Sequence, residues 1–232
     1  MSGVLNPCRI RGAGTEDAGE RPVLTVAQVF ELAVQVGRRP GGTVRCLRGG
    51  YRLRFRRHGE MRTSPELYGT RREADRALWK MVGDGRADCT HDRRFSALVL
   101  LVTFTSLRWG DATALRRCDL DLQAATVRVR AAYVERSTGE MLLGPPKSKA
   151  GRRIVGIPDA IIPALRAHLS VFVMDEPGAL VFPSVMGGPL RRGNFNRGSA
   201  WPHAVESIGM AGLHFHDPSR TGNHFAARSG AG

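Results

Sequence analysis

One arginine of this chain has surroundings that suggest phosphate binding. Arg108 follows the apolar run of residues 95–107 and is followed at once by Trp109, Gly110 and Asp111. A charged side chain beside a hydrophobic core needs a partner, because an unpaired buried charge is costly. That partner could be Asp111 or a bound phosphate, and these residues alone leave both alternatives open.

A second group of arginines has the spacing of a β-strand. Residues 51–56 alternate strictly between apolar side chains and arginines, so the apolar side chains should face a core and the arginines the opposite side. A small antiparallel sheet with an arginine face can enter a DNA groove. The alternative is an ordinary solvated face, but such faces usually mix the signs of their charges. The candidate DNA-contacting residues are Arg45, Arg52, Arg54 and Arg56.

The charge of the whole chain also favours nucleic acid as the partner. Its 232 residues include 35 Lys+Arg and 21 Asp+Glu, which gives a formal net charge of +14. Residues 38–94 hold 16 of the basic and 7 of the acidic residues, so a quarter of the chain carries more than half of the excess charge. Such an excess indicates DNA first and an anionic membrane second. A GC-rich genome would also raise the arginine content, but it explains the net charge less well.

Several classes of protein and site are not indicated. The cysteines form no CxxC pair, so neither a disulfide framework nor a zinc site is predicted. No window of 18 uncharged apolar residues occurs, and the N-terminal residues contain no apolar signal segment. We therefore expect a cytoplasmic protein without a metal, cofactor, membrane partner or small-molecule substrate. Its 42% hydrophobic content is sufficient for a packed core.

The N-terminal elements are marked by capping and turn residues. A capping box of Thr25 and Gln28 predicts a helix to Val36, with Gly37 at its end. Residues 38–42 are expected to form a linker. Strands are predicted at 43–47, 51–55 and 61–64, and a second capping box at Thr70 predicts a helix to Val82.

The remaining elements must position Arg108 and the residues after it. A helix buried on all sides is predicted before Arg108, and another over residues 113–117. Strands are predicted at 126–130, 141–143 and 153–157, with a hairpin that joins the last two. Further elements are expected at 160–169 (helix), 180–182 (extended), 191–208 (weakly helical) and 223–228 (helix).

Three segments resemble, in order and spacing, the catalytic domain of tyrosine recombinases of the phage-integrase type. They are TSLRWGDATALRRCDLDL, GPPKSKAGRRIVGIP and LHFHDPSRTG, within residues 95–232. Residues 42–88 resemble, more loosely, the arm-type DNA-binding domain of the same integrases, through GTVRCLRGGYRLRFR and GTRREADRALW. The resemblance implies an α+β fold class. It would combine a mainly helical catalytic domain, containing a small antiparallel hairpin sheet, with a small domain of three strands and one helix.

In that family a tyrosine attacks the scissile phosphate, forms a 3′-phosphotyrosyl link and releases a 5′-hydroxyl group. The charge of the transition state requires fixed guanidinium groups and a histidine, and the leaving oxygen requires a proton donor. By motif, the resemblance implies that Arg108 is the first catalytic arginine and that Asp111 supports it. It implies that Lys147, or less readily Lys149, is the hairpin lysine. His216 corresponds to the histidine of the second motif.

The chain departs from the family at the second motif. The family reads His-x-Leu-Arg-His, whereas residues 216–220 read His-Asp-Pro-Ser-Arg, so that Ser219 stands where the second arginine belongs. Arg220 comes one residue later, which is about 100° around a helix, so we expect it to point elsewhere. The three tyrosines, Tyr51, Tyr68 and Tyr133, all precede His216, and none is at the position of the family's nucleophile.

The order of segments departs as well. Residues 21–37 resemble the piece that directly precedes the catalytic domain, but here the arm-like domain interrupts the two. We therefore expect a disordered tail at 1–21, a leader helix at 22–40, an arm-type domain at 41–92 and a truncated catalytic domain at 93–232.

The expected function is that of a phage-integrase-like protein of site-specific recombination and DNA integration that binds DNA but does not recombine it alone. Its expected partners are double-stranded DNA and full-length integrase protomers. The alternatives are a non-enzymatic regulator that competes for integrase sites, and an unstable fragment without function.

Overall fold

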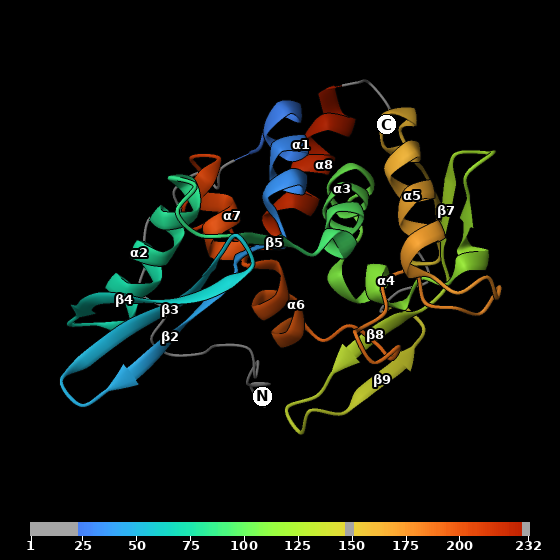
Figure 1. The fold of residues 1–232 in the computed structure, drawn as a ribbon. Helices are drawn as coiled ribbons and strands as arrows, with labels where there is room; N and C mark the ends of the chain where they lie inside the picture. The colour runs from blue at the N-terminus through green and yellow to red at the C-terminus, as the bar shows by residue number, and fades with distance from the viewer. Residues whose placement is uncertain (1–22, 147–150, 229–232) are drawn as a thin grey trace, which may run out of the picture.

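The computed structural model describes residues 23–146 and 151–228. It is a mixed helix and strand structure in which a larger helical body carries small sheets along one side, and a separate small sheet with one helix extends from the other side (Figure 1). The expected tail at 1–21 and both hairpin lysines, Lys147 and Lys149, lie outside the described residues. None of the described helices is long and apolar enough to cross a membrane.

The small sheet has the three expected strands. They are antiparallel, in the order β2 (Gly42–Leu47), β3 (Gly50–Arg57) and β4 (Glu60–Tyr68). The last strand runs four residues beyond the expected end at Ser64. Helix α2 (Arg71–Gly83) begins with the expected capping box and covers one face of the sheet. Leu53 and Phe55 are buried against Ala74 and Leu78 there, which confirms the alternation predicted for residues 51–56.

A two-stranded ribbon joins the small sheet to the body. Strand β1 (Arg38–Pro40) pairs with β5 (Cys89–His91) in antiparallel register. The linker expected at residues 38–42 is therefore wrong in part, because the two crossing segments satisfy each other's backbone polar groups. Trp79 of α2 also stacks on His203 of the body, with ring centroids 3.4 Å apart and planes 16° apart. These contacts set the small sheet at a fixed place beside the body.

The body is organised around α3 (Ser96–Thr105), which is buried on almost every side as predicted. It packs against α1 (Val26–Gln35), which has the expected capping box, and against α5 (Ile162–Phe172) and α8 (Asp217–Arg228). Ser106 adopts a left-handed conformation, with φ of 52°, and ends α3. The next helix, α4, spans Trp109–Ala114. The helix expected at 113–117 is therefore misplaced, because the tight turn at Ser106 lets α4 begin directly after Arg108.

Five strands line one side of the body. They form one sheet in the order β10 (Arg153–Gly156), β7 (Thr126–Val129), β6 (Leu120–Asp121), and a ribbon of β8 (Ala132–Glu135) with β9 (Met141–Gly144). The expected hairpin between 141–143 and 153–157 is wrong, because β9 pairs with the unexpected strand β8 and β10 pairs with β7. In the sequence, the segment that contains Lys147 lies between β9 and β10.

Two short helices complete the floor of the body, α6 (Arg192–Ser199) and α7 (Trp201–Ser207). Phe195 of α6 packs edge-on against Trp109 and Phe215, with centroids 5.3 and 4.6 Å away. Helix α8 begins six residues before the expected 223, and the carboxylate of Asp217 accepts a hydrogen bond of 2.8 Å from the His214 N–H. This cap brings His216 to the start of α8.

Candidate functional site

A cleft of about 1240 Å³ brings together segments that are far apart in the sequence. It lies between the start of α4, strands β8 and β10, the start of α6 and the first turns of α8. The charged and polar residues of its lining that bear on its chemistry are Arg108, Arg153, Arg192, His216, Ser219 and Arg220. Arg108 and His216, two of the residues singled out in the sequence, therefore share one site. The third, Lys147, is outside the described residues.

Asp111 supports Arg108 through the backbone. Its buried carboxylate, 6% exposed, accepts hydrogen bonds of 3.4 Å from the Arg108 N–H and from Nη2 of Arg153. The ion pair of Asp111 is thus formed with Arg153, which the sequence gave no reason to expect. In the part of the chain that the structure describes, the exposed Arg108 guanidinium forms no ion pair. It is held at the cleft by its backbone and is available to an anion.

Replacement of Asp111 by alanine should destabilise the fold by about 2 kcal/mol. The substitution leaves the partly exposed Arg153 guanidinium and the Arg108 N–H without their acceptor. Chemical denaturation of the parent, Asp111→Ala, Arg153→Ala and the double variant would measure the change in the free energy of unfolding. We expect the double variant to lose less than the two single losses combined; strictly additive losses would contradict the pairing.

His216 is held by an arginine from another helix. Nη1 of Arg192 lies 2.8 Å from Nε2 of His216. Because a guanidinium can only donate, the imidazole accepts at Nε2, and its single proton lies on Nδ1. Partial desolvation, followed by the charge of Arg192, lowers the pKa of His216 below its usual range. Arg192 also lies over the Trp109 ring, 5.6 Å from its centroid, in a cation–π contact.

The second motif presents a hydroxyl group and a long arginine to the cleft. Ser219 Oγ donates a hydrogen bond of 2.8 Å to the backbone carbonyl oxygen of His216. Arg220 is also among the residues that line the cleft, one position after Ser219. Ser219 and Arg220 both lie in the first turn of α8. Tyr133 of β8 also lines the cleft, which its place in the sequence did not indicate.

The arginine face of the small sheet is a second basic surface. Arg45 lies directly opposite Arg52 in the pairing of β2 with β3, and Arg54 lies opposite Thr43 and Thr63. Like charges placed directly opposite each other are destabilising, and a bound anion would relieve the repulsion. The buried Nε of Arg52 has no hydrogen-bond partner within residues 23–146 and 151–228.

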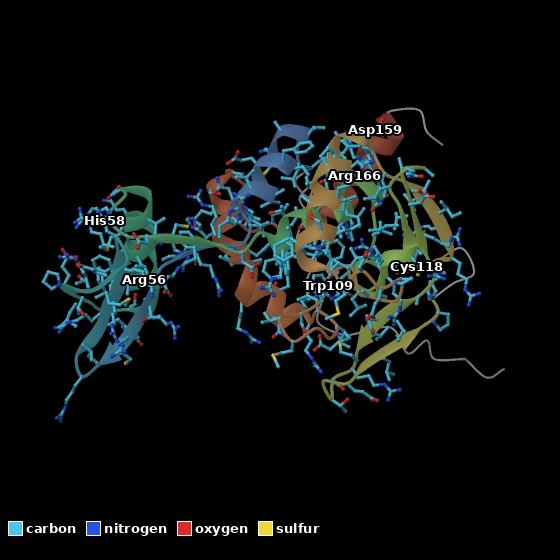
Figure 2. The ribbon with its side chains drawn as sticks, turned by 45° about the vertical axis from the view of Figure 1, so that its right-hand side comes forward. Arg56, His58, Trp109, Cys118, Asp159 and Arg166 are labelled. Carbon is cyan, nitrogen blue, oxygen red and sulfur yellow. The ribbon has the colours of Figure 1, made fainter. Side chains whose placement is uncertain are left out.

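The four predicted arginines of the sheet do not all gather in one place. Arg45, Arg52 and Arg54 line a hollow of about 350 Å³. Arg56 lines a different hollow, of about 680 Å³, with Arg39. Figure 2 shows Arg56 on the small sheet, well away from Trp109 in the body.

Sequence reasoning missed Arg153 and Arg192. Arg153 lies in a predicted strand, but nothing in the sequence connects it with Asp111. Arg192 lies in a polar, weakly helical segment whose position depends on tertiary packing. Among the described residues, no group of three or more His, Cys, Asp or Glu side chains is placed to hold a metal ion.

Comparison with known sequences identifies relatives but no matching family model. The chain is 34% identical over 137 residues to a protein named prophage phiRv2 integrase from Mycobacterium tuberculosis (strain ATCC 25618 / H37Rv), which covers 59% of this chain and 36% of that protein. It is 28% identical over 141 residues to the integrase of Mycobacterium phage L5, which covers 60% of this chain and 37% of that protein. The chain therefore spans little more than a third of these curated relatives.

The fold is similar to that of an integrase whose structures were solved in complex with DNA. The Tn1549 transposon integrase in complex with transposon right end DNA aligns with a TM-score of 0.50 and 16% identity, over 72% of this chain and 55% of that chain. The same integrase in complex with a circular intermediate DNA aligns with a TM-score of 0.50 and 15% identity, over the same shares. At such low identity the likeness concerns the fold alone.

Proposed function

We propose that this chain, a homologue of phage integrases, acts as a DNA-binding member of the tyrosine recombinase family. It would bind the duplex DNA of site-specific recombination and hold a phosphodiester in the cleft at Arg108 without cleaving it. The observation that carries this proposal is the convergence of Arg108, Arg192 and His216 on one cleft from three separate segments. Guanidinium and imidazole groups in that arrangement suit the non-bridging oxygens of a phosphate.

The charge balance of the cleft supports anion binding. Among the described residues, four arginines and one acidic residue, Glu135, line it. Glu135 accepts a hydrogen bond of 3.2 Å from Nη1 of Arg191, the residue just before α6. Asp111 is engaged with Arg153. Both of these carboxylates thus have a cationic partner, while Arg108 is an exposed residue of the cleft lining. The arginine face of the small sheet would add a second contact with the same DNA, as the arm-type domain proposed for residues 41–92.

The proposed absence of cleavage rests on the second motif. Phosphoryl transfer to tyrosine requires charged donors that meet the oxygens as charge develops on them. Ser219 offers one neutral hydroxyl, and that hydroxyl already donates to the His216 carbonyl oxygen. We therefore propose that this polypeptide by itself binds DNA and forms no covalent link to it.

A nicked suicide substrate tests both parts of the proposal. The purified chain should retard the duplex in a gel and leave no adduct that survives denaturation in detergent, since Ser219 offers no positive charge to the transition state. A stable adduct would disprove the proposed inactivity. Tyr133→Phe is then the matched variant, because Tyr133 is the tyrosine that lines the cleft. Failure to retard the duplex at low salt would disprove DNA binding.

A second candidate function is that of a non-enzymatic regulator that competes for integrase sites. The observation in its favour is that Arg45, Arg52 and Arg54 form a basic surface separate from the cleft. Competition with a full-length integrase on arm-site DNA would distinguish the two functions. A regulator of this kind displaces the integrase even when Arg108 is replaced by alanine.

A further inference from the structure

Helix α6 brings a second guanidinium, that of Arg192, to the cleft of Arg108. Ser219 supplies no charge, and its hydroxyl is engaged with the backbone. Arg192, at the start of α6, lies on the same cleft and reaches the imidazole of His216. Its neighbour Arg191, by contrast, donates hydrogen bonds to Glu135 and to the carbonyl oxygen of Gly139, at 3.2 and 2.6 Å. The two adjacent arginines therefore have different tasks.

Arg192 is held in place by an aromatic ring and a histidine, and its charge is not neutralised by a neighbouring carboxylate of the described residues. Its guanidinium stacks over Trp109, the residue next to Arg108, and donates to His216. Within the described ranges it forms no ion pair with an acidic side chain. A planar guanidinium fixed by an aromatic ring and one hydrogen bond keeps its remaining N–H groups for an anion.

We propose that Arg192 is a phosphate-binding residue of the cleft and supplies the guanidinium that Ser219 lacks, so that a DNA phosphodiester is held between Arg108, Arg192 and His216. This inference rests on the proposed function and assigns the second charged contact of that site. Arg192 approaches from α6, opposite the first turn of α8, so the phosphate would be bound across the cleft from Ser219.

The contact with His216 gives the proposal a second readout. In the free protein the pKa of His216 is lowered by desolvation and then by Arg192, while Asp217 raises it and Arg220 and His214 lower it further. A phosphate that takes up the N–H groups of Arg192 adds negative charge next to the imidazole and raises its pKa. Between the free and bound pKa values, binding takes up a proton, so the affinity should increase as the pH falls through that interval.

The decisive experiment compares Arg192→Gln with Arg197→Gln in fluorescence anisotropy, with a labelled DNA duplex as the probe and the full chain as the protein. Arg197 lies on the same helix but outside this cleft, where it donates to Asn194 Oδ1. Arg192→Gln should weaken binding roughly tenfold and reduce the salt slope by about 1, because one phosphate contact is lost. Arg197→Gln should change neither quantity.

Rescue makes the test specific. Ser219→Arg in the Arg192→Gln background should restore most of the lost affinity, because it returns a guanidinium to the other side of the same phosphate. Arg192→Lys, which keeps the charge and the packing, should keep the salt slope and lose only part of the affinity. It also keeps the test valid if Arg192→Gln does not fold. In an NMR titration, Arg192→Gln should raise the pKa of His216.

The outcomes separate this inference from the proposed function. If the parent binds DNA and Arg192→Gln binds as tightly as Arg197→Gln, the role of Arg192 is refuted while DNA binding stands. If the parent does not bind the duplex, the proposed function itself fails. An unchanged affinity together with a raised pKa of His216 would show that Arg192 only positions the histidine, and would also overturn the proposal.

Discussion

Gly222→Ala is expected to destabilise the protein by about 3 kcal/mol or more and to weaken DNA binding at the cleft. Gly222 lies in α8 where this helix crosses α3, and it is buried. A methyl group at this position would overlap the backbone carbonyl oxygen of Thr103 and lie 2.6 Å from Ser106 Oγ. Backbone atoms cannot move aside as a flexible side chain can, so α8 would have to shift.

A shift of α8 would also displace the residues that α8 contributes to the cleft. His216 lies just before α8 and Ser219 in its first turn, six and three residues before Gly222. Thermal unfolding and DNA anisotropy on the same preparation would show both effects. Gly83→Ala is the matched control, since Gly83 ends α2, has open space around its Cα and should tolerate or slightly favour alanine. Parent-like stability of Gly222→Ala would contradict the close crossing of α8 and α3.

The sequence predicted most of the local structure because local signals are strong in this chain. The capping boxes at Thr25 and Thr70 fixed two helix starts, and the alternation in residues 51–56 assigned each side chain of β3 to a face. The apolar run before Arg108 predicted a helix buried on nearly all sides, as found. Each of these signals acts within a few residues, where spacing determines geometry.

The errors occurred where partners come from distant parts of the chain. Residues 38–40 form a strand only because Cys89–His91 lies beside them. Strand β9 pairs with β8 across a turn that contains Gly139, at φ of 81°, a hairpin signal that the prediction overlooked. The site shows the same limit. Motif resemblance identified Arg108 and His216, but the pairing of Asp111 with Arg153 joins two residues that lie 42 positions apart in the sequence. A short motif identifies the site residues that lie within it, but it does not identify charged residues that other elements bring to the same site.

The arginine face of the small sheet leads to the second large expected effect. Joint replacement of Arg52 and Arg54 by alanine should reduce the slope of log Kd against log salt by about 2 and weaken binding at low salt roughly tenfold or more. The two side chains lie on the face of β3 opposite α2, so their loss leaves the core of Leu53 and Phe55 intact. Removal of Arg52 also relieves its repulsion with Arg45, and stability should therefore hold or rise.

A matched control separates position from charge. Arg62→Ala with Arg76→Ala removes two charges from the same small domain, but Arg76 is on α2 and Arg62 pairs with Glu60 at 2.8 Å. If the overall field of the domain attracts DNA, both double variants should flatten the salt dependence equally. If the sheet itself meets the phosphates, only Arg52→Ala with Arg54→Ala should do so. An unchanged slope in that variant would exclude the sheet from the DNA interface and leave the cleft at Arg108 as the sole proposed contact.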